Sequence, residues 1–289
     1  MIQQIVVLGG GQMGNGIAHV CAQAGYAVTV VDISEKQREL AQATITKNLD
    51  RSVSKGNLSE AAKKETLARL SFCDAIPHRD FDLLIEAVTE NVVLKTKLLA
   101  DASHRLKKEA IIASNTSSIS LTQLAVATDR PEQVIGMHFM NPVPLMQLVE
   151  VIRSLTTSEA TFQAVAEVIE KIGKTMVVSQ DMPGFIVNRI LMPMINEAIY
   201  SLYEGIATAE DIDRAMKLGT NQPMGPLALA DLIGLDTCLA IMSVLHEGFS
   251  DSKYRPCPLL RNYVNAGWLG RKAGRGFYQY GGSVSCQKT

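Results

Sequence analysis

Four short, nearly unbroken runs of apolar residues constrain the fold of this chain more than any other feature. They are IVVLG (5–9), AVTVVD (27–32), DLLIEA (82–87) and AIIAS (110–114), and stretches with helical patterning separate them. Strands that are apolar on both faces are typical of a parallel sheet covered by helices. We therefore expect an α/β domain in the first part of the chain.

Three further strand candidates follow the first four. They are QVIGMHF (133–139), QLVEVI (147–152) and KTMVVS (174–179). Because few helical residues separate these later runs, the connections there leave room for an antiparallel section of the sheet.

The long connection from Ser34 to about Leu70 predicts two helices instead of one. Gly56 breaks the helical pattern, and Ser59 is suited to cap the second helix. This helical hairpin is an insertion into an otherwise plain nucleotide-binding fold. Its tip carries Lys55, and on composition alone the basic residues of this region indicate a solvated face.

The pattern changes at Pro183-Gly184, a dipeptide that breaks regular structure. Beyond it the sequence predicts helices, at 185–203, 208–218 and 227–246. We therefore expect two domains: residues 1–183 form a Rossmann-type domain with the inserted hairpin, and residues 184–289 form an all-α domain.

The composition narrows the class of protein and of partner. Of the 289 residues, 47% are hydrophobic and 20% are charged, which is ordinary for a globular protein. The net charge of −1 provides no overall field that would attract nucleic acid or an anionic membrane. The five cysteines include no CxxC pair, so we expect no metal site. No basic leader or apolar run of about 18 residues is present, which favours a cytoplasmic protein.

A dinucleotide site is predicted directly after the first apolar run. Gly9, Gly11 and Gly14 form a GxGxxG motif between a strand and a helix, and Asp32 ends the next strand. The spacing alone is weak evidence, but this context is what the pyrophosphate of a dinucleotide requires. Asp32 can accept hydrogen bonds from both ribose hydroxyls and repels a 2′-phosphate, so NAD is favoured over NADP. The nearby Lys36 leaves NADP as an alternative.

Hydride chemistry also needs a group that handles the alcohol proton, and histidine has a suitable pKa. Of the five histidines, His138 differs because it closes a strand, where open α/β sheets place their ligands. Glu150, in the next strand candidate, can orient the imidazole and stabilise its cation. Taken alone, His138 could instead be a core histidine. The other four are interpreted as structural or solvated: His19, His78, His104 and His246.

The motifs taken together resemble the 3-hydroxyacyl-CoA dehydrogenase family over nearly the whole chain, and in particular its short bacterial members that act on 3-hydroxybutyryl-CoA. The resemblance rests on GGGQMGNGIA, IEAVTEN, SNTSSIS, GMHFMNPVPLMQLVEVI, DMPGFIVNRI, GPLALADLIGLD and GRKAGRGFY. The HFMNPVP run separates this family from β-hydroxyacid dehydrogenases that use a catalytic lysine.

The resemblance implies a site for an acyl-CoA and a role for each catalytic residue. His138 would be the general base and Glu150 its orienting partner. Ser117 would hydrogen-bond the 3-oxygen of the substrate, and Asn188 would complete the polar site from the second domain. The enzyme would interconvert an (S)-3-hydroxyacyl-CoA and a 3-oxoacyl-CoA with NAD.

The same resemblance implies further ligand contacts and an assembly. The helical domain would form a homodimer interface. Ser52 and Lys55 match, more loosely, the helical region that holds CoA. The cofactor contacts beyond the three glycines and Asp32 would be Gln12, Met13, Glu90, Lys95, Asn141 and Lys272.

Two other functions compete with this prediction. A relative that acts on a sugar acid is the nearest, and HFMNPVP favours the thioester. A protein that binds NAD without catalysis is the other. The joint presence of Ser117, His138, Glu150 and Asn188 argues against it, since binding alone needs only the nucleotide site.

Overall fold

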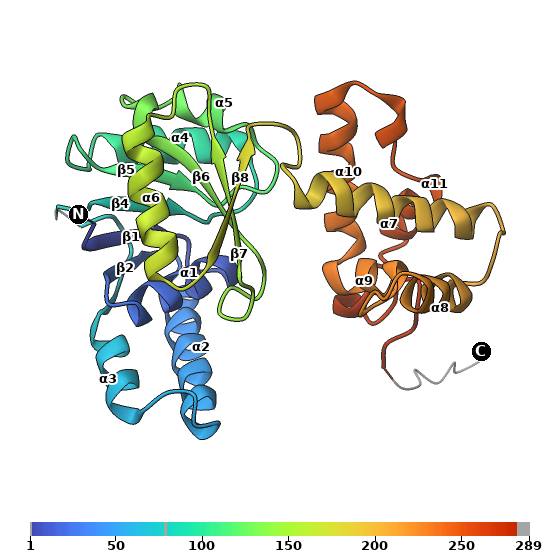
Figure 1. The fold of residues 1–289 in the computed structure, drawn as a ribbon, viewed down its shortest axis with the longest axis horizontal. Coiled ribbons are helices and arrows are strands. Elements are labelled where there is room, and N and C mark those ends of the chain that lie inside the picture. Colours follow the sequence, from blue (N-terminus) through green and yellow to red (C-terminus); the bar gives the residue numbers. More distant parts are fainter. Residues whose placement is uncertain (1, 78–79, 282–289) are drawn as a thin grey trace. The chain divides into compact units, whose positions relative to one another are not determined.

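The computed structural model describes residues 2–77 and 80–281 (Figure 1). The chain forms two compact units that divide between Phe185 and Ile186. The predicted domain boundary, at Pro183-Gly184, lies two residues before this division.

The first unit is built on one sheet, in the order β3-β2-β1-β4-β5-β6-β7-β8. All neighbouring strands are parallel except β6 and β7, which are antiparallel. The α/β fold with a mostly parallel sheet is therefore confirmed. The strands are β1 (Gln4–Leu8), β2 (Ala27–Val31), β3 (Leu70–Cys73), β4 (Leu83–Glu86), β5 (Ile111–Ser114), β6 (Val134–Phe139), β7 (Leu148–Arg153) and β8 (Thr175–Gln180).

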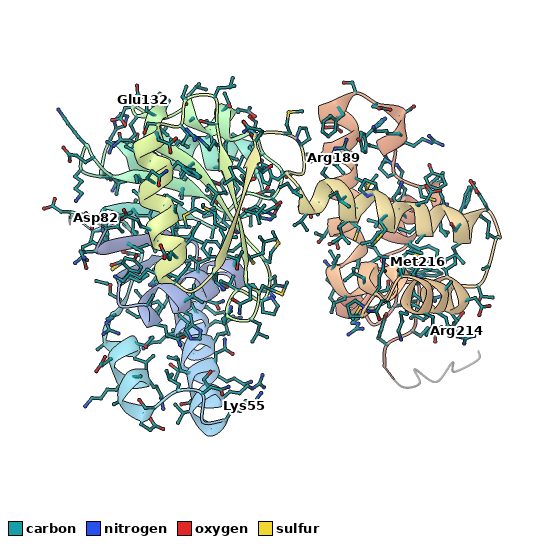
Figure 2. The ribbon with its side chains drawn as sticks, viewed as in Figure 1. Lys55, Asp82, Glu132, Arg189, Arg214 and Met216 are labelled. Atoms are coloured by element: carbon teal, nitrogen blue, oxygen red, sulfur yellow. The ribbon has the colours of Figure 1, made fainter. Side chains whose placement is uncertain are left out.

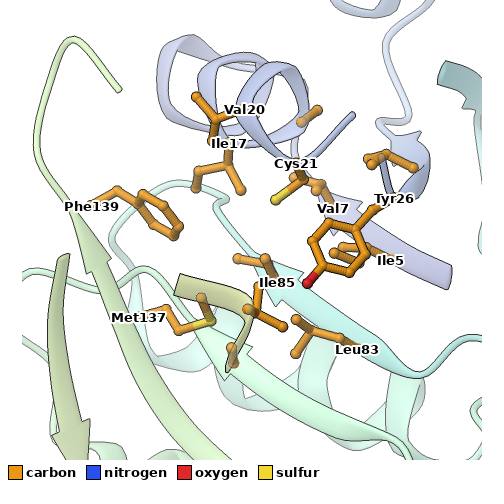
Figure 3. Close-up of a cluster of buried hydrophobic side chains, with 14 of the residues drawn as sticks. Ile5, Val7, Ile17, Val20, Cys21, Tyr26, Leu83, Ile85, Met137 and Phe139 are labelled. Atoms are coloured by element: carbon orange, nitrogen blue, oxygen red, sulfur yellow. The ribbon is translucent and has the colours of Figure 1, made fainter. Parts of the chain in front are cut away.

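Apolar side chains pack on both faces of this sheet, as the unbroken apolar runs predict. Ile5 and Val7 belong to one buried cluster, and Val6 and Leu8 belong to a second. This alternation is the two-residue period of a strand. Figure 3 shows the first cluster, in which Ile17 and Cys21 of a covering helix lie with Val7, Ile85 and Phe139 of the strands. The covering helices are α1 (Gln12–Gln23), α2 (Glu35–Ser54) and α6 (Glu159–Lys171) at the first cluster, with α4 (Val92–Ser103) and α5 (Leu121–Ala125) at the second.

The inserted helical hairpin is present as α2 followed by α3 (Glu60–Ala68). Gly56 has a φ of +73°, which ends the first helix, and Oγ of Ser59 accepts the N–H of Ala62 at 3.1 Å as a cap. The prediction did not include β3, which follows α3 directly. This edge strand is short and only half-buried, so it lacks the apolar run that identified the other strands.

The second unit is helical, as predicted, but one predicted helix is wrong. The segment 227–246 contains two helices that meet at a bend of 98°. Gly234, between them, has a φ of +103°, a conformation that side chains rarely adopt. The helices are α7 (Val187–Tyr203), α8 (Ala209–Gly219), α9 (Pro226–Ile233), α10 (Leu235–Phe249) and α11 (Pro258–Asn265).

Two of the sequence motifs in this unit have a structural explanation. The buried carboxylate of Asp231, in GPLALADLIGLD, accepts the N–H groups of Phe277 and Tyr278 at 3.0 and 2.9 Å. A Cβ on Gly276 would lie 1.9 Å from that carboxylate. The glycine and the aspartate therefore fix the GRKAGRGFY segment against α9.

No single helix among the described residues is long and apolar enough to cross a membrane. The bent pair α9 and α10 meets the length and hydropathy test only when the two helices are taken together.

Candidate active site

The glycine motif lies between β1 and α1, and its three glycines meet different requirements. Gly9 has a φ of +96°, and a Cβ there would lie 2.7 Å from the carbonyl oxygen of Ala87. A Cβ on Gly14 would lie 1.8 Å from the carbonyl oxygen of Gly9. A Cβ on Gly11 would meet nothing within 4 Å. The protein's own packing thus requires Gly9 and Gly14, whereas Gly11 leaves open space for a ligand.

Asp32 follows β2 and is held in place by two backbone groups. Its Oδ2 accepts the N–H of Gly10 at 2.8 Å, and its Oδ1 accepts the N–H of Ser34 at 2.9 Å. A cavity of about 600 Å³ lies beside it and includes Gly9, Gly11, Gln12, Met13 and Asp32 among its lining residues. The remainder of the lining is mostly apolar, with Ile33 92% exposed. These residues fit a dinucleotide, because a carboxylate, open backbone and apolar surface meet at the N-terminus of a helix.

His138 and Glu150 face each other across the antiparallel pair β6 and β7. Nδ1 of His138 lies 2.7 Å from Oε2 of Glu150, and the two residues are 5% and 0% exposed. A carboxylate can only accept at this distance, so Nδ1 carries the proton in this pair. In the neutral imidazole, Nε2 then carries the lone pair and can accept a proton from a ligand.

Ser117 lies on the other side of the imidazole. Its Oγ is 3.0 Å from Nε2 of His138, and its backbone N–H donates to Oε1 of Glu90 at 2.9 Å. Ser117 belongs to the turn that follows β5, and the end of β5 is next to that of β6 in the sheet. The structure therefore brings Ser117, His138 and Glu150 into one hydrogen-bonded series.

The turn that carries Ser117 is organised by the carboxylate of Glu90. Besides the N–H of Ser117, its Oε1 accepts the hydroxyl of Thr116 at 2.5 Å, and the N–H and hydroxyl of Ser118 at 3.0 and 2.9 Å. Burial alone would raise the pKa of Glu90, but the charge of Lys95 and the hydroxyl donors hold it below its ordinary value. Glu90 is therefore ionised at neutral pH.

The carboxylate of Glu90 forms an ion pair with the buried side chain of Lys95. Its ammonium lies 3.2 Å from Oε2 of Glu90 and 2.7 Å from Oε1 of Glu86, and its side chain is 1% exposed. The prediction placed Lys95 against the cofactor or the cleft. In this arrangement its charge is satisfied by two carboxylates, so it acts on the site through Glu90.

Several residues that organise the site had no predicted role. Glu86 is fully buried and accepts the hydroxyl of Ser114 at 2.6 Å and the N–H of Val88 at 2.7 Å. Asn115 accepts the N–H of Phe139 at 2.8 Å and so joins the ends of β5 and β6. The sequence does contain a signal for both residues. Glu86 ends a buried strand and Asn115 follows one, and the carboxyl ends of such strands form the edge where α/β sheets bind ligands.

Asn141 and Gln12, two predicted cofactor contacts, lie together. Nε2 of Gln12 donates to Oδ1 of Asn141 at 3.0 Å. This bond joins the first turn of α1 to the loop between β6 and β7. The loop is also fixed by Lys174, whose ammonium donates to the carbonyl oxygens of Val143 and Met146 at 2.7 and 2.6 Å.

Two predicted site residues belong to the second unit. Asn188 lies in the first turn of α7, where it is 8% exposed. Lys272 forms an ion pair with Asp236, with 2.6 Å between Nζ and Oδ1. Burial would raise the pKa of Asp236, but the ion pair with Lys272 and the backbone N–H donors together hold that pKa below its ordinary value. The roles of Asn188 and Lys272 towards ligands stay predictions.

Ser52 and Lys55, the predicted CoA contacts, lie at the end of α2. Figure 2 shows Lys55 at the tip of the hairpin, where it is exposed. The hydroxyl of Ser52 donates to the carbonyl oxygen of Asn48 at 3.1 Å, a bond within the helix. Contact with CoA stays a prediction for both residues.

The other histidines differ from His138 in their surroundings. His19 is 3% exposed within α1, and its Nδ1 has no hydrogen-bond partner among the described residues. Burial lowers its pKa to about 4. His104 is exposed, and His78 lies outside the described residues. No group of three or more His, Cys, Asp and Glu side chains in residues 2–77 and 80–281 is arranged to hold a metal ion.

Two family models match the chain. The model described as 3-hydroxyacyl-CoA dehydrogenase, NAD binding domain, matches residues 4–182, and the one described as 3-hydroxyacyl-CoA dehydrogenase, C-terminal domain, matches residues 184–280. Among curated relatives, the chain is 58% identical to the 3-hydroxybutyryl-CoA dehydrogenase of Bradyrhizobium diazoefficiens, over 98% of this chain and 97% of that protein. It is 54% identical to a probable 3-hydroxybutyryl-CoA dehydrogenase of Bacillus subtilis, over 96% and 98%.

A solved structure with a similar fold is that of (S)-3-hydroxybutyryl-CoA dehydrogenase from Ralstonia eutropha. It matches with a TM-score of 0.94 and 50% identity, over 98% of this chain and 100% of that one. A more distant match is a diketoreductase, with a TM-score of 0.82 and 31% identity over 96% and 99% of the two chains.

Proposed function

Since the chain belongs to the 3-hydroxyacyl-CoA dehydrogenase family, we propose that it interconverts (S)-3-hydroxybutyryl-CoA and acetoacetyl-CoA, with NAD as the hydride carrier. The four-carbon substrate is supported by the names of the relatives from Bradyrhizobium diazoefficiens, Bacillus subtilis and Ralstonia eutropha. The observation that carries the proposal is the series from Glu150 through His138 to Ser117.

His138 is the general base of this reaction. Its Nε2 takes the proton of the 3-hydroxyl group when the alcohol is oxidised, and returns it when the ketone is reduced. Glu150 accepts the Nδ1 proton throughout and stabilises the imidazolium that forms. NAD, when bound, supplies the acceptor for the hydride that leaves carbon 3.

Ser117 binds the 3-oxygen. Its hydroxyl can donate to that oxygen while its backbone N–H remains bonded to Glu90, so the turn does not have to move. Asn188 adds a polar group from α7 to the same oxygen or to the thioester. Ser52 and Lys55 bind the CoA portion from the helical hairpin.

The residues of the glycine motif would hold the cofactor, NAD. The backbone at Gly11 and the N–H groups at the start of α1 would bind its pyrophosphate. Asp32 accepts the adenosine ribose hydroxyls, and Gln12, Met13, Glu90 and Asn141 line the remainder of the site. Lys272, which belongs to the second unit, is a further proposed contact of the cofactor.

The test compares three substrates in one assay, the oxidation of NADH. Acetoacetyl-CoA is the expected substrate, and free acetoacetate and an oxidised sugar acid are expected to react at least about 100-fold more slowly, because they lack the CoA contacts. Faster turnover of the sugar acid would replace the proposed substrate class. No turnover of any of the three would favour a protein that only binds NAD.

We also propose that the protein is a homodimer joined through its helical unit. Analytical ultracentrifugation at micromolar concentration measures the mass directly. Sedimentation as a monomer would contradict this part of the proposal.

A further inference from the structure

Phe185 contacts the ring of the general base. It is the last residue of the first unit and is 5% exposed. The centroids of its ring and of the His138 imidazole are 5.7 Å apart, and the ring planes meet at 61°. This is an edge-to-face contact, the arrangement that aromatic pairs favour.

The two hydrogen bonds of His138 do not by themselves prevent its imidazole from rotating, so a packed neighbour such as Phe185 can add to its orientation. Glu150 and Ser117 bond its two nitrogens, so they specify where each nitrogen must lie. In the absence of packing, an imidazole can still rotate about its Cβ–Cγ bond and exchange these partners for water. A ring packed against the imidazole opposes that rotation, because buried rotamers are held by the side chains around them.

The backbone of Phe185 is strained in a way that side-chain packing explains. Its φ is +49°, in the left-handed region where a residue with a bulky side chain is an outlier. Such strain persists where the surrounding structure fixes the residue. The side chain of Phe185 packs into the second apolar cluster, with Leu121 and Ile152, so burial of the ring holds the backbone there.

The segment before Phe185 is anchored independently. Both carboxylate oxygens of Asp181 are bonded to the start of α5, to the N–H groups of Leu121 and Thr122 at 2.9 and 2.8 Å. The N–H of Phe185 donates to the carbonyl oxygen of Met182 at 3.0 Å. The backbone directly before Phe185 is therefore fixed, and this restricts where the phenyl ring can lie.

We propose that Phe185 is a positioning residue for catalysis: its ring holds the imidazole of His138 in the orientation that keeps Nδ1 on Glu150 and Nε2 at Ser117. The proposal rests on the proposed function of His138 as general base. Phe185 acts through His138, so it governs turnover and not the binding of cofactor.

Four variants distinguish the effect of losing the aromatic contact with His138 from the effect of disturbing the apolar packing in general. Phe185→Leu and Phe185→Met remove the ring and keep an apolar side chain, and Met is flexible enough to fill the space if Leu destabilises the fold. Phe185→Tyr keeps the ring. Phe81→Leu is the matched control, because Phe81 is fully buried in the same apolar cluster.

Steady-state kinetics provide the first measurement. We expect Phe185→Leu and Phe185→Met to lower kcat for acetoacetyl-CoA by about tenfold or more, as small displacements of catalytic groups do. The KM for NADH should stay unchanged, and Phe185→Tyr should retain most of the wild-type kcat. If Phe185→Leu lowers kcat no more than Phe81→Leu does, or raises the KM for NADH at unchanged kcat, the proposal is overturned.

The second measurement needs no substrate. In protein labelled with ¹⁵N-histidine, the Nδ1 proton of His138 should give a downfield signal that is protected from exchange with water and is absent in His138→Gln. Phe185→Leu should speed its exchange, and Phe81→Leu should not. Equal protection in both variants would overturn the proposal. An inactive wild-type protein would count against the proposed function alone, since this signal still tests the contact.

Discussion

Glu150 lies 2.7 Å from Nδ1 of His138 because the two residues are directly paired on antiparallel strands. Antiparallel pairing brings opposite side chains on one face within contact, whereas a shift by one residue would turn one of them to the other face. The proposed catalytic pair therefore depends on the register of β6 and β7. It is the only antiparallel pairing among the named strands of the described chain.

Replacing either member of this pair should abolish efficient turnover. His138→Gln removes the base, and Glu150→Gln removes the charge that stabilises the imidazolium, so each should lower kcat by about 10²- to 10⁴-fold. The affinity for NADH, measured by fluorescence titration, should remain. Glu170→Gln, an exposed position on α6, is the control. Retained activity in His138→Gln would refute its role.

Asp32 should determine the choice between the two nicotinamide cofactors. In Asp32→Arg the repulsion of a 2′-phosphate is replaced by attraction, so the ratio of kcat/KM for NADPH to that for NADH should rise by at least about tenfold. The ratio is the measurement, because the loss of the bonds to Gly10 and Ser34 will lower both values. An unchanged ratio would count against this assignment of Asp32.

Gly11 and Gly14 should respond differently to alanine. In Gly14→Ala the new Cβ meets the carbonyl oxygen of Gly9 at 1.8 Å, so thermal stability and NADH binding should both fall. In Gly11→Ala the Cβ enters open space, so stability should be kept and only NADH binding weakened. Differential scanning fluorimetry with and without NADH distinguishes the two cases. Equal loss of stability in both would contradict this distinction.

His19 should make the protein less stable in mild acid. Burial lowers its pKa from 6.5 to about 4 in the folded state, so between these values the unfolded chain binds a proton that the folded chain does not. Lowering the pH through this window therefore favours unfolding, and stability is regained above it. From pH 7 to pH 5 the contribution is about 2 kcal/mol.

Urea unfolding at these two pH values measures this contribution. His19→Gln cannot titrate, so its loss of stability on acidification should be smaller than that of the wild type by about 2 kcal/mol. His104→Gln, at an exposed position, is the control and should behave as the wild type. If both variants lose as much stability as the wild type, His19 is not the responsible group.

Lys95 should be needed for stability as well as activity. Lys95→Met leaves the buried carboxylate of Glu86 without its counter-charge, which should cost about 3–5 kcal/mol of unfolding free energy. The double variant Glu86→Gln/Lys95→Met should recover part of that loss, because the fully buried residue 86 then carries no charge, while Glu90 still lacks its partner. Lys97→Met, on the exposed side of the same helix, should change little. A double variant no more stable than Lys95→Met would argue against the pairing.

The order of residues along the chain was enough to predict the architecture of the first unit and the principal members of the candidate site. Apolar runs identify strands buried on both faces, and the glycine motif and Asp32 follow from where these strands end. His138 and Glu150 could be paired in advance because the strands on which they lie are adjacent in the chain. These inferences depend on local periodicity and on short separations, which are properties of the sequence.

The contacts that join distant segments of the chain became visible only in the folded protein. The edge strand β3 has no apolar run, and the bend at Gly234 depends on a positive φ that an apolar helical pattern conceals. Glu90 meets Ser117, and Phe185 meets His138, only after strands from different parts of the chain have been placed side by side. Such contacts are set by the order and register of the sheet, and no local pattern of residues encodes them.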